Sequence, residues 1–517
     1  MRRLLRIWLA LAMANTVALA QTNAPGQIRP LSLQEAIQLA LKHNYDLQID
    51  RYNPQIALYN VQGAYAGYDP TLSFSGEHDR SETGPQLQYL SGAIFRTLGS
   101  ASDVNQFSST LSGVTPIGTS YTLSGNARDI TGASAGAPFE NSDASAGFNL
   151  SQPLLKNFWI DANRLNIRVA KNRLKYSELT LRLQIMQTVT RLEQAYYDLI
   201  YNRENVMVQQ KAVELAERLV MENRKRLEVG ALAPLDLQSA EAQAASSRAA
   251  VIAARSQLGT QERVVKALIS DEYNQWASLT LEPVGTLNAP VPVVNLQDSW
   301  SKGLTQRPDL LQAKLDVERQ GIQLKYDKNQ LLPEVDAFGS YNFNGTSSKN
   351  IFNPLSPGSG TGAGGEFSDA FTSVSQLDNR QYSYGGRISF PLSNVRTRNA
   401  YRADRATMQQ LVLGIKQLEQ NIMIMIDNDI GVIRANYDQA QATRAAREYE
   451  EAALDAEQKK LESGKSTTYT VLQVQRDLTT ARGNEIQALD TYNKSLSQLS
   501  LDEGSTLLRL GVTLEVR

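Results

Sequence analysis

A seven-residue repeat of apolar side chains constrains this chain more than any other feature of its sequence. Between positions 158 and 230 it comprises Ile185, Leu192, Leu199, Val206, Val213, Val220 and Leu227. A heptad repeat of this length predicts a long helix that packs along neighbouring helices. The companion positions turn polar at Arg203 and Gln210, so the apolar stripe is narrow and suits one helix in a curved wall. At about 1.5 Å per residue, some 70 residues reach about 105 Å, several times the roughly 30 Å hydrocarbon core of a bilayer.

The long helix is followed by a glycine turn and a returning helix. Gly230 ends the first pattern, and Pro234 and Asp236 begin the next one. The return carries its own heptad at Leu237, Ala244, Val251, Leu258 and Val265. Two heptad-bearing arms joined at a glycine predict a helical hairpin over about 158–270. The proline-containing segment that follows indicates a boundary near position 293.

The second half of the chain repeats the plan of the first half. At one constant offset, Leu296, Leu304, Leu310 and Pro333 match Leu33, Leu41, Leu47 and Pro70. A second heptad comprises Ile426, Ile433, Ala440, Leu454 and Leu461; Arg447 interrupts it and Gly464 ends it. The duplication predicts a first structural repeat over 21–293 and a second over 294–500, with its helical hairpin over about 395–499. Residues 501–517 form a tail with a weak strand pattern.

Short alternating segments precede each predicted hairpin. They lie at about 71–80, 106–126 and 145–153 in the first half and at about 335–344 and 382–391 in the second. Alternation of apolar and small polar residues predicts strands with one apolar face. The intervening segments 81–105 and 127–144 are rich in small and polar residues and are expected to be loops. The first half holds an extra hairpin around Pro116, and the sequence leaves open whether this hairpin joins a barrel or forms an extracellular loop.

The first twenty residues have the composition of a secretory signal. Arg2 and Arg3 precede an apolar run, and small residues at Ala18 and Ala20 close it, so a signal peptide over 1–20 is predicted. The chain contains no cysteine, which excludes disulfides and thiolate ligands. A formal net charge of −1 gives no indication of a nucleic-acid partner.

Strands with one apolar and one polar face suit a barrel wall between lipid and water. The predicted strands are too few to close such a barrel, so several protomers are needed. The hydrophilic helical part is expected to project from the bilayer into water. The fold class that meets both needs is mostly α with a β-barrel portion, in which duplicated helix–strand–hairpin units from several protomers form a transmembrane β-barrel continued by an α-helical barrel.

The motifs that could carry chemistry are weak. Gly360 to Gly365 fits a dinucleotide fingerprint in spacing, but no strand–turn–helix unit surrounds it. Gly464-Lys465-Ser466 lacks the first glycine of a phosphate-binding loop and reads as a turn. His43 and His78, the chain's histidines, lie on different predicted elements. We therefore expect no catalytic residues, no cofactor, no metal and no enzymatic activity.

The order of these elements resembles the TolC-like outer-membrane efflux protein family over nearly all of the chain after the leader. The segments that carry the resemblance are 33–36 and 44–47, their counterparts 296–298 and 307–310, the strand openers Pro70 and Pro333, the strand ends 148–153 and 388–391, and the turns 229–231 and 463–465. The resemblance implies a homotrimer with a β-barrel in the outer membrane and an α-helical barrel in the periplasm. It implies the outer-membrane exit duct of a tripartite efflux or type I secretion system, in contact with outer-membrane lipid.

The same resemblance assigns roles to the two turns. A periplasmic adaptor protein would dock on Val229, Gly230, Ala231, Ser463, Gly464 and Lys465, and an inner-membrane transporter would drive export. The alternative is a structural coiled-coil protein that spans the envelope and has no lumen. The sequence does not name the exported substrate.

The resemblance also implies an acidic ring at the periplasmic entrance, six and nine positions after each turn glycine. Asp236 stands at the first of these positions, whereas Thr470 and Gln473 occupy both positions of the second hairpin. Ser466 stands where some members carry a basic residue that latches the entrance shut. The candidate gate therefore comprises Asp236, Ser466, Thr470 and Gln473. The alternative for Asp236 is a favourable charge in the first turn of a helix.

Overall fold

The computed structural model describes residues 28–90, 92–96, 98–134, 137–230, 233–350 and 366–511. The predicted signal peptide, Ala231 and the Gly360–Gly365 segment lie outside these residues. The chain divides into two compact units, and each draws on both sequence repeats. We call them the sheet unit (Asn53–Thr180 and Asp309–Leu418) and the helical unit (the part up to Tyr52, Leu181–Pro308 and the part from Glu419).

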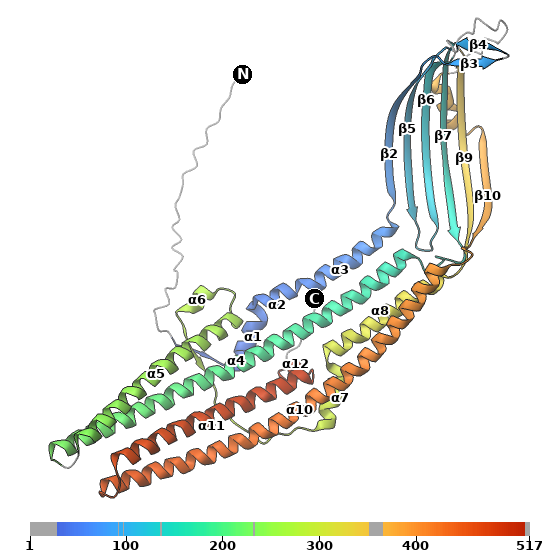
Figure 1. The fold of residues 1–517 in the computed structure, drawn as a ribbon. Helices are drawn as coiled ribbons and strands as arrows, with labels where there is room; N and C mark the ends of the chain where they lie inside the picture. Colours follow the sequence, from blue (N-terminus) through green and yellow to red (C-terminus); the bar gives the residue numbers. More distant parts are fainter. Residues whose placement is uncertain are drawn as a thin grey trace, which may run out of the picture. The chain divides into compact units, whose positions relative to one another are not determined.

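The sheet unit is built on a six-stranded antiparallel sheet with the order β10-β9-β7-β6-β5-β2 (Figure 1). The strands are β2 (Thr71–Thr83), β5 (Ser100–Val114), β6 (Ser120–Ser134), β7 (Ala137–Pro153), β9 (Glu334–Asn350) and β10 (Arg380–Ser389). The hairpin around Pro116 joins β5 to β6, so it belongs to this sheet. Of the two alternatives that the sequence leaves open, the structure therefore favours a hairpin that joins the other strands over a separate extracellular loop.

The strands of the first half extend well into the segments 81–105 and 127–144, which the sequence analysis expects to be loops. In the parts of β2, β5, β6 and β7 that lie in these segments, polar residues occur on both faces, so hydropathy shows no regular alternation. Hydrogen bonding nevertheless continues in register, as between Asn126 and Ser145 or Asp129 and Ser142. Backbone hydrogen bonds between neighbouring strands therefore define these strands, although their side chains do not alternate between apolar and polar residues.

The register gives the sheet two chemically different faces. One rung across all six strands consists of Leu72, Leu111, Leu123, Phe148, Tyr341 and Tyr382. The neighbouring rung, which points to the opposite side, consists of Thr71, Ser112, Thr122, Asn149, Ser340 and Ser383. We refer to these sides as the apolar face and the polar face of the sheet.

Several further elements belong to the sheet unit. They are α3 (Tyr52–Ala64), the short η1 (Tyr65–Tyr68), the two-stranded hairpin β3 (Leu87–Leu90) with β4 (Ala93–Arg96), α8 (Pro308–Gln330) and α9 (Phe367–Ser375). The short helix α9 packs on β7 and β9.

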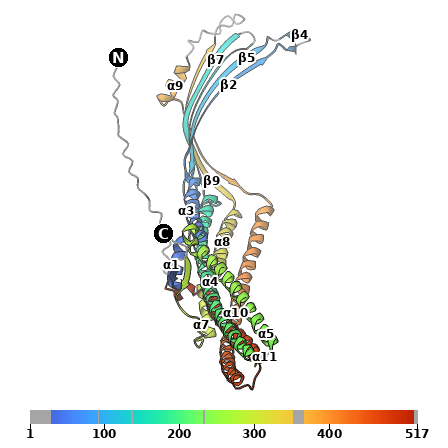
Figure 2. The same cartoon turned by 90° about the vertical axis from the view of Figure 1, so that its left-hand side faces the viewer.

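The helical unit contains two long hairpins. The first consists of α4 (Ala162–Glu228) with α5 (Pro234–Ile269), and the second of α10 (Val395–Glu462) with α11 (Thr468–Asp502). The first parts of α4 and α10 belong to the sheet unit. Within the helical unit the four arms run side by side and both turns lie at the same end (Figures 1 and 2).

Short elements surround the ends of the arms that lie away from the turns. They are β1 (Ile28–Leu31), which pairs in parallel with β8 (Thr280–Pro283), and the helices α1 (Leu33–His43), α2 (Tyr45–Asp50), α6 (Tyr273–Ala277), α7 (Leu296–Gln306) and α12 (Thr506–Arg509). The main core joins α1, α2, β8 and α12 to the heptad residues Ile185, Leu192 and Leu199 of α4. The described part of the tail, for which the sequence shows a weak strand pattern, contains the helix α12, and Leu507 of this helix packs in the main core.

Candidate functional site

The first hairpin turn is formed around Gly230. Its φ of 73° lies in the left-handed region, which an L side chain adopts only at a cost. The Gly230 amide donates to the Leu227 carbonyl at 2.9 Å, which closes the last turn of α4. Val229, next to it, is 78% exposed. Beside Gly230, the end of α4 therefore presents an apolar side chain to its surroundings.

Asp236 lies in the first turn of α5, behind Pro234 at the start of that helix. Ala233 offers no side-chain cap, so the carboxylate is well placed to interact with the free amides of the helix end. Asp236 is half-buried, and within the part of the chain that the structure describes its carboxylate has no hydrogen bond or ion pair. Leu235 beside it is 70% exposed.

The second turn repeats the backbone geometry with different side chains. Gly464 has a φ of 74°, and the Lys465 amide donates to the Lys460 carbonyl at 2.8 Å, which is the Schellman arrangement. The Thr467 hydroxyl caps α11 by accepting from the Thr470 amide at 3.3 Å. Their hydroxyls also lie 2.9 Å apart. Thr470 therefore belongs to the helix cap.

The remaining predicted residues of the second turn divide into two groups. Ser463, Lys465 and Gln473 are exposed. Ser466 donates its hydroxyl to the carboxylate of Glu457, which lies on the opposite arm. Thus Ser466 bonds to Glu457, an acidic residue that precedes Gly464, and not to an acidic residue that follows this glycine.

Glu457 is the residue at this turn that sequence reasoning missed. Its carboxylate accepts from Ser466 and from the Lys460 ammonium at 3.0 Å. The Ser466 hydroxyl, and after it Lys460, holds the pKa of Glu457 below its usual value. The signal in the sequence was the spacing of three between Glu457 and Lys460, which is typical of an intrahelical ion pair.

A shared apolar cluster holds the arms of the two hairpins together near the turns. It combines one residue of α4 with five residues of the second hairpin: Leu219, Leu454, Leu461, Val471, Leu472 and Leu478. Each of these side chains is at most 7% exposed. Both turns are therefore presented by one packed body, although they are more than two hundred residues apart in the sequence.

The sheet supplies the second part of the candidate site. Its apolar face carries large side chains that are strongly exposed, such as Phe74 at 75% and Tyr384 at 84%. Its polar face carries hydroxyl pairs, as between Ser75 and Ser108 at 2.6 Å and between Ser340 and Ser383 at 2.7 Å. Such a sheet suits a wall with lipid on one side and water on the other.

Both ends of the sheet remain open. In the described residues β2 pairs only with β5, and β10 pairs only with β9. An unpaired strand edge in hydrocarbon is costly, because its amides and carbonyls find no hydrogen-bond partner there. A second copy of the chain that adds its β10 to this β2 would pair one edge of each copy, and a closed ring of copies would pair every edge.

The described residues contain no cluster of three or more histidine, cysteine, aspartate or glutamate side chains fit to hold a metal ion. His43 bonds to Asp271 at 2.7 Å, and His78 lies 2.8 Å from Asn105, so the two histidines lie in separate environments. Among the helices in the described residues, none is both long and apolar enough to span a membrane. Gly464, Lys465 and Ser466 form the turn of a helical hairpin, as the sequence predicts.

The two-faced open sheet and the long helical hairpins define the class of a multi-protomer outer-membrane channel. A model of the family described as "Outer membrane efflux protein" matches residues 36–270 and 300–501. The chain belongs to this family.

Two curated relatives support the assignment. The chain is 24% identical over 369 residues to outer membrane protein TolC of Vibrio cholerae serotype O1, a match that covers 70% of this chain and 77% of that protein. It is 22% identical over 345 residues to outer membrane efflux protein BepC of Brucella suis, which covers 66% and 68% of the two chains.

Solved structures show the same fold at lower sequence identity. The outer-membrane channel OprN matches with a TM-score of 0.63 at 13% identity, over 92% of this chain and 90% of that chain. CusC matches with a TM-score of 0.62 at 16% identity, over 92% and 91%. VceC from Vibrio cholerae matches with a TM-score of 0.61 at 16% identity, over 93% and 96%.

These matches confirm the resemblance seen in the sequence and its fold class. The chain is an outer-membrane efflux channel that extends into the periplasm, and its family is one of channels and not of enzymes. Channels of this family are trimeric components of tripartite efflux systems.

Proposed function

We propose that three copies of this chain form the exit duct of a tripartite efflux system, with a barrel to which each protomer contributes six strands. The observation that carries the proposal is the six-stranded sheet with one apolar face, one polar face and two open edges. Three such sheets joined edge to edge make a barrel of about 18 strands, and barrels of that size leave a water-filled lumen. The polar face then lines the lumen, and solutes pass without chemical change.

The turns of the two hairpins are the proposed docking surface for a periplasmic adaptor. Exposed apolar side chains at a hairpin end, such as Val229, Leu235 and Tyr469, indicate a protein contact. The turn residues Gly230, Ser463, Gly464 and Lys465 lie beside them in the same unit and are exposed. An inner-membrane transporter that acts through this adaptor would supply the energy for export, because the described residues of the channel contain no site at which an energy source could act.

Asp236 is the proposed residue of the entrance gate. It is a half-buried carboxylate without an ion-pair partner in the described residues, near the end of the hairpin where three copies would converge. Three such carboxylates around an axis would attract cations and repel anions. Thr470 and Gln473 carry no charge, and Thr470 is engaged in the cap of α11, so the second hairpin adds no acidic ring of this kind.

Single-channel recording in planar bilayers tests both the duct and the gate. The purified wild-type trimer is expected to conduct, and the absence of conductance would favour the structural spacer without a lumen. Asp236→Asn is expected to change conductance or block by divalent cations. A matched control is Glu241→Gln, five residues further along α5, where the carboxylate already pairs with Arg224 at 3.0 Å. If Asp236→Asn conducts like the wild type, the role in the gate is wrong and the favourable helix charge remains.

A further inference from the structure

The short helix α9 lies on the apolar face of the sheet, where a membrane protein would be expected to meet lipid. It packs on β7 and β9, and Figure 2 shows it against one side of the sheet. Its Ala370 is fully buried against these strands, whereas Phe371 is 61% exposed. A capping box between Glu366 and Asp369 begins the helix and defines its direction. One side of α9 is thus anchored and the other remains free.

Small residues of the sheet make room for α9. Gly345 belongs to the apolar face, and a Cβ atom added there would lie 1.9 Å from the Ala370 carbonyl oxygen. Ser142, Ala144 and Ser347, also on the apolar face, are at most 9% exposed. Only small side chains allow a helix backbone to approach another backbone so closely. The position of α9 therefore depends directly on Gly345.

Next to α9 the apolar face contains a cavity of about 520 Å³. Five side chains of the sheet and two of the helix form its apolar lining: Phe74, Phe107, Ala127, Ala144, Ala146, Phe371 and Val374. Phe107, Ala127 and Ala144 follow one another across a single rung of β5, β6 and β7. The cavity therefore opens on the apolar face and not on the polar face that faces the proposed lumen.

The surroundings of the cavity identify its occupant. The next rungs toward the periplasmic strand ends carry the exposed Phe74 and then Leu72 with Leu111, so the cavity is continuous with the band that contacts lipid tails. On its other side the rung is polar, with His78 bonded to Asn105 at 2.8 Å and Ser142 donating to Asp129 at 2.8 Å. A cleft at the boundary between an apolar band and a polar rung suits the chain of a lipid whose headgroup lies at the polar rung.

We propose that the cleft between α9 and the apolar face binds an acyl chain of an outer-membrane lipid, one for each protomer. The helix converts part of the lipid-facing surface into a defined site, because Phe371 and Val374 close the side that a flat strand surface leaves open. The site lies on the side of the sheet opposite the proposed lumen face, and it belongs to the sheet unit, whereas the hairpin turns belong to the helical unit. Lipid binding and export can therefore fail independently in an experiment.

A glycine substitution on β9 tests the site without altering any residue that lines the cavity. Gly345→Val is expected to displace α9, and Gly339→Val is the matched control on the same strand and the same face, where an added Cβ would have only the Ser383 carbonyl at 3.8 Å. Native mass spectrometry of the trimer, exchanged into detergent and supplied with phosphatidylethanolamine, reports retained lipid. Wild type and Gly339→Val are expected to retain up to one lipid per protomer, and Gly345→Val none. Equal retention by the three proteins, or none by the wild type, would overturn the proposal.

A second variant covers the case in which Gly345→Val does not assemble. Phe371→Ser removes an exposed aromatic side chain from the lining without affecting the Gly345 contact. It is expected to lower lipid retention at least tenfold while the trimer stays intact. Retention equal to that of the wild type would contradict the assignment.

The absence of cysteine from the chain allows a direct optical test. A fluorophore attached at Ser375→Cys, the last residue of α9, is expected to be quenched by phosphatidylethanolamine with brominated chains at much lower lipid content than a fluorophore at Ser340→Cys on the polar face. Quenching at Ser375 that follows only the bulk fraction of brominated lipid would show an ordinary lipid contact and no site.

Discussion

The first hairpin, α4 with α5, and the second, α10 with α11, share a backbone plan but differ in the side chains that join their arms. The long arms contain 67 and 68 residues, and the return arms contain 36 and 35. The turn glycines have φ angles of 73° and 74°. Arm length and turn geometry are therefore the features that the two repeats share.

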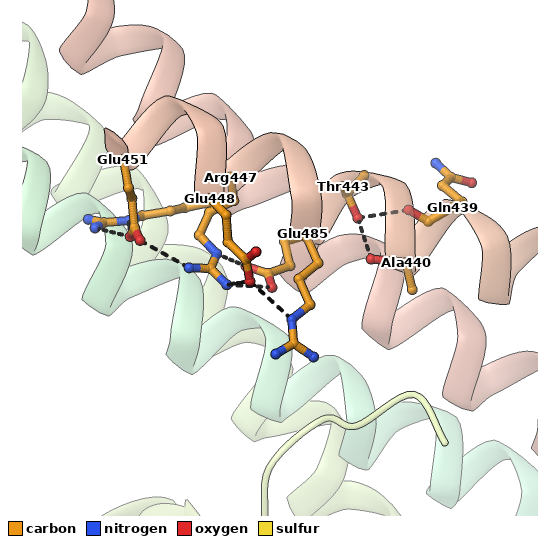
Figure 3. A network of polar contacts seen from close by, with 9 residues as sticks. Gln439, Ala440, Thr443, Arg447, Glu448, Glu451 and Glu485 are labelled. Carbon is orange, nitrogen blue, oxygen red and sulfur yellow. Dashed lines mark hydrogen bonds and ion pairs between the residues drawn. The ribbon is translucent and has the colours of Figure 1, made fainter. Parts of the chain in front are cut away.

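The arms of the second hairpin are joined by a network of charged side chains, which Figure 3 shows from close by. Arg447 of α10 bonds to Glu485 of α11 at 2.8 Å and to Glu451 of its own helix at 3.0 Å. Arg482 of α11 bonds back to Glu451 at 2.6 Å. Arg447 is 23% and Glu485 17% exposed, so the network is partly shielded from water.

In the first hairpin, α5 presents small buried residues, and it approaches α11 of the second hairpin closely. Ala240, Ala244 and Ala254 of α5 are buried. The ion pairs across its arms, Arg224 with Glu241 and Arg248 with Glu217, have side chains between 44% and 62% exposed. The comparison teaches that the turn geometry is the constant of this architecture, whereas the ion pairs that cross the arms are exposed in the first hairpin and partly shielded in the second.

The largest expected effect concerns the feature that the two hairpins share. Gly464→Val and Gly230→Val each force a β-branched residue to a φ near 74°, which should cost about 2–3 kcal/mol of hairpin stability in both cases. Among the described residues, neither glycine has a neighbouring atom within 4 Å of an added Cβ, so the expected cost comes from the backbone. Hydrogen exchange of the arm amides next to each turn measures it.

Gly483→Ala is the control for this prediction. Gly483 lies inside α11, and an added Cβ there also meets nothing within 4 Å. Alanine should therefore stabilise the helix by about 0.5–1 kcal/mol. A clearly smaller cost at Gly230 than at Gly464 would show that the two turns are not equivalent.

The second prediction targets the difference between the hairpins. Arg447→Met keeps an unbranched apolar stem but leaves Glu485 and Glu451 without their shared partner, and should destabilise the second hairpin by about 1–2 kcal/mol. Arg248→Met in the first hairpin removes an exposed ion pair and should cost less than about 1 kcal/mol. Chemical denaturation of the two variants in the same detergent measures the contrast. Equal costs would contradict the view that shielding makes the Arg447 network stronger.

The sequence predicted the helical hairpins well because their heptads report packing directly. Ile426, Ile433, Ala440, Leu454 and Leu461 are all buried, as their spacing required. Arg447 appeared to interrupt this repeat, whereas in the structure its stem follows the same side of α10 and its charge is neutralised across the hairpin. A single sequence could not show this, because Glu485 is nearly forty residues away.

The candidate site was predictable only in part. Gly230 and Gly464 could be found because a glycine after a long heptad signals a helix end. The bond between Ser466 and Glu457 could not, because it joins the two sides of a turn and depends on their relative rotation. The parts of β2, β5, β6 and β7 in segments 81–105 and 127–144 were missed because they carry polar residues on both faces, so that only backbone pairing shows them.

The third prediction compares the carboxylates that the two long helices bury. Glu193 of α4 binds Arg509, a cation, whereas Asp429 of α10 faces the carboxylate of Asp502, with Arg307 3.3 Å from that second carboxylate. Burial and then Asp502 raise the pKa of Asp429 to about 7, against the opposing effect of Arg307. Because the folded state holds this proton more tightly than the unfolded state, stability is lost as the pH rises from about 4 to about 7.

Asp429→Asn removes that loss. The variant should be more stable than the wild type by about 1 kcal/mol near pH 8, after allowance for solvent screening, and should have no advantage near pH 4. Thermal unfolding over this pH range measures the difference. Glu193→Gln is the matched comparison in the first hairpin and should be less stable than the wild type near pH 8, because Arg509 loses its anionic partner. A loss of stability at pH 8 in Asp429→Asn would show that Asp429 is charged and favourably paired.

The smallest expected effect concerns Ser466 at the second turn. Ser466→Ala removes the hydroxyl that donates to Glu457, so the pKa of Glu457 should rise toward its usual value. A lowered pKa contributes stability above the unfolded value that is lost as the pH falls through the folded value. Amides at the second turn should therefore be better protected from exchange in the wild type than in Ser466→Ala at neutral pH, and this difference should vanish as the pH falls through the pKa of Glu457, while amides beside Gly230 behave alike in both proteins. If both turns respond alike, the bond between Ser466 and Glu457 is not what distinguishes them.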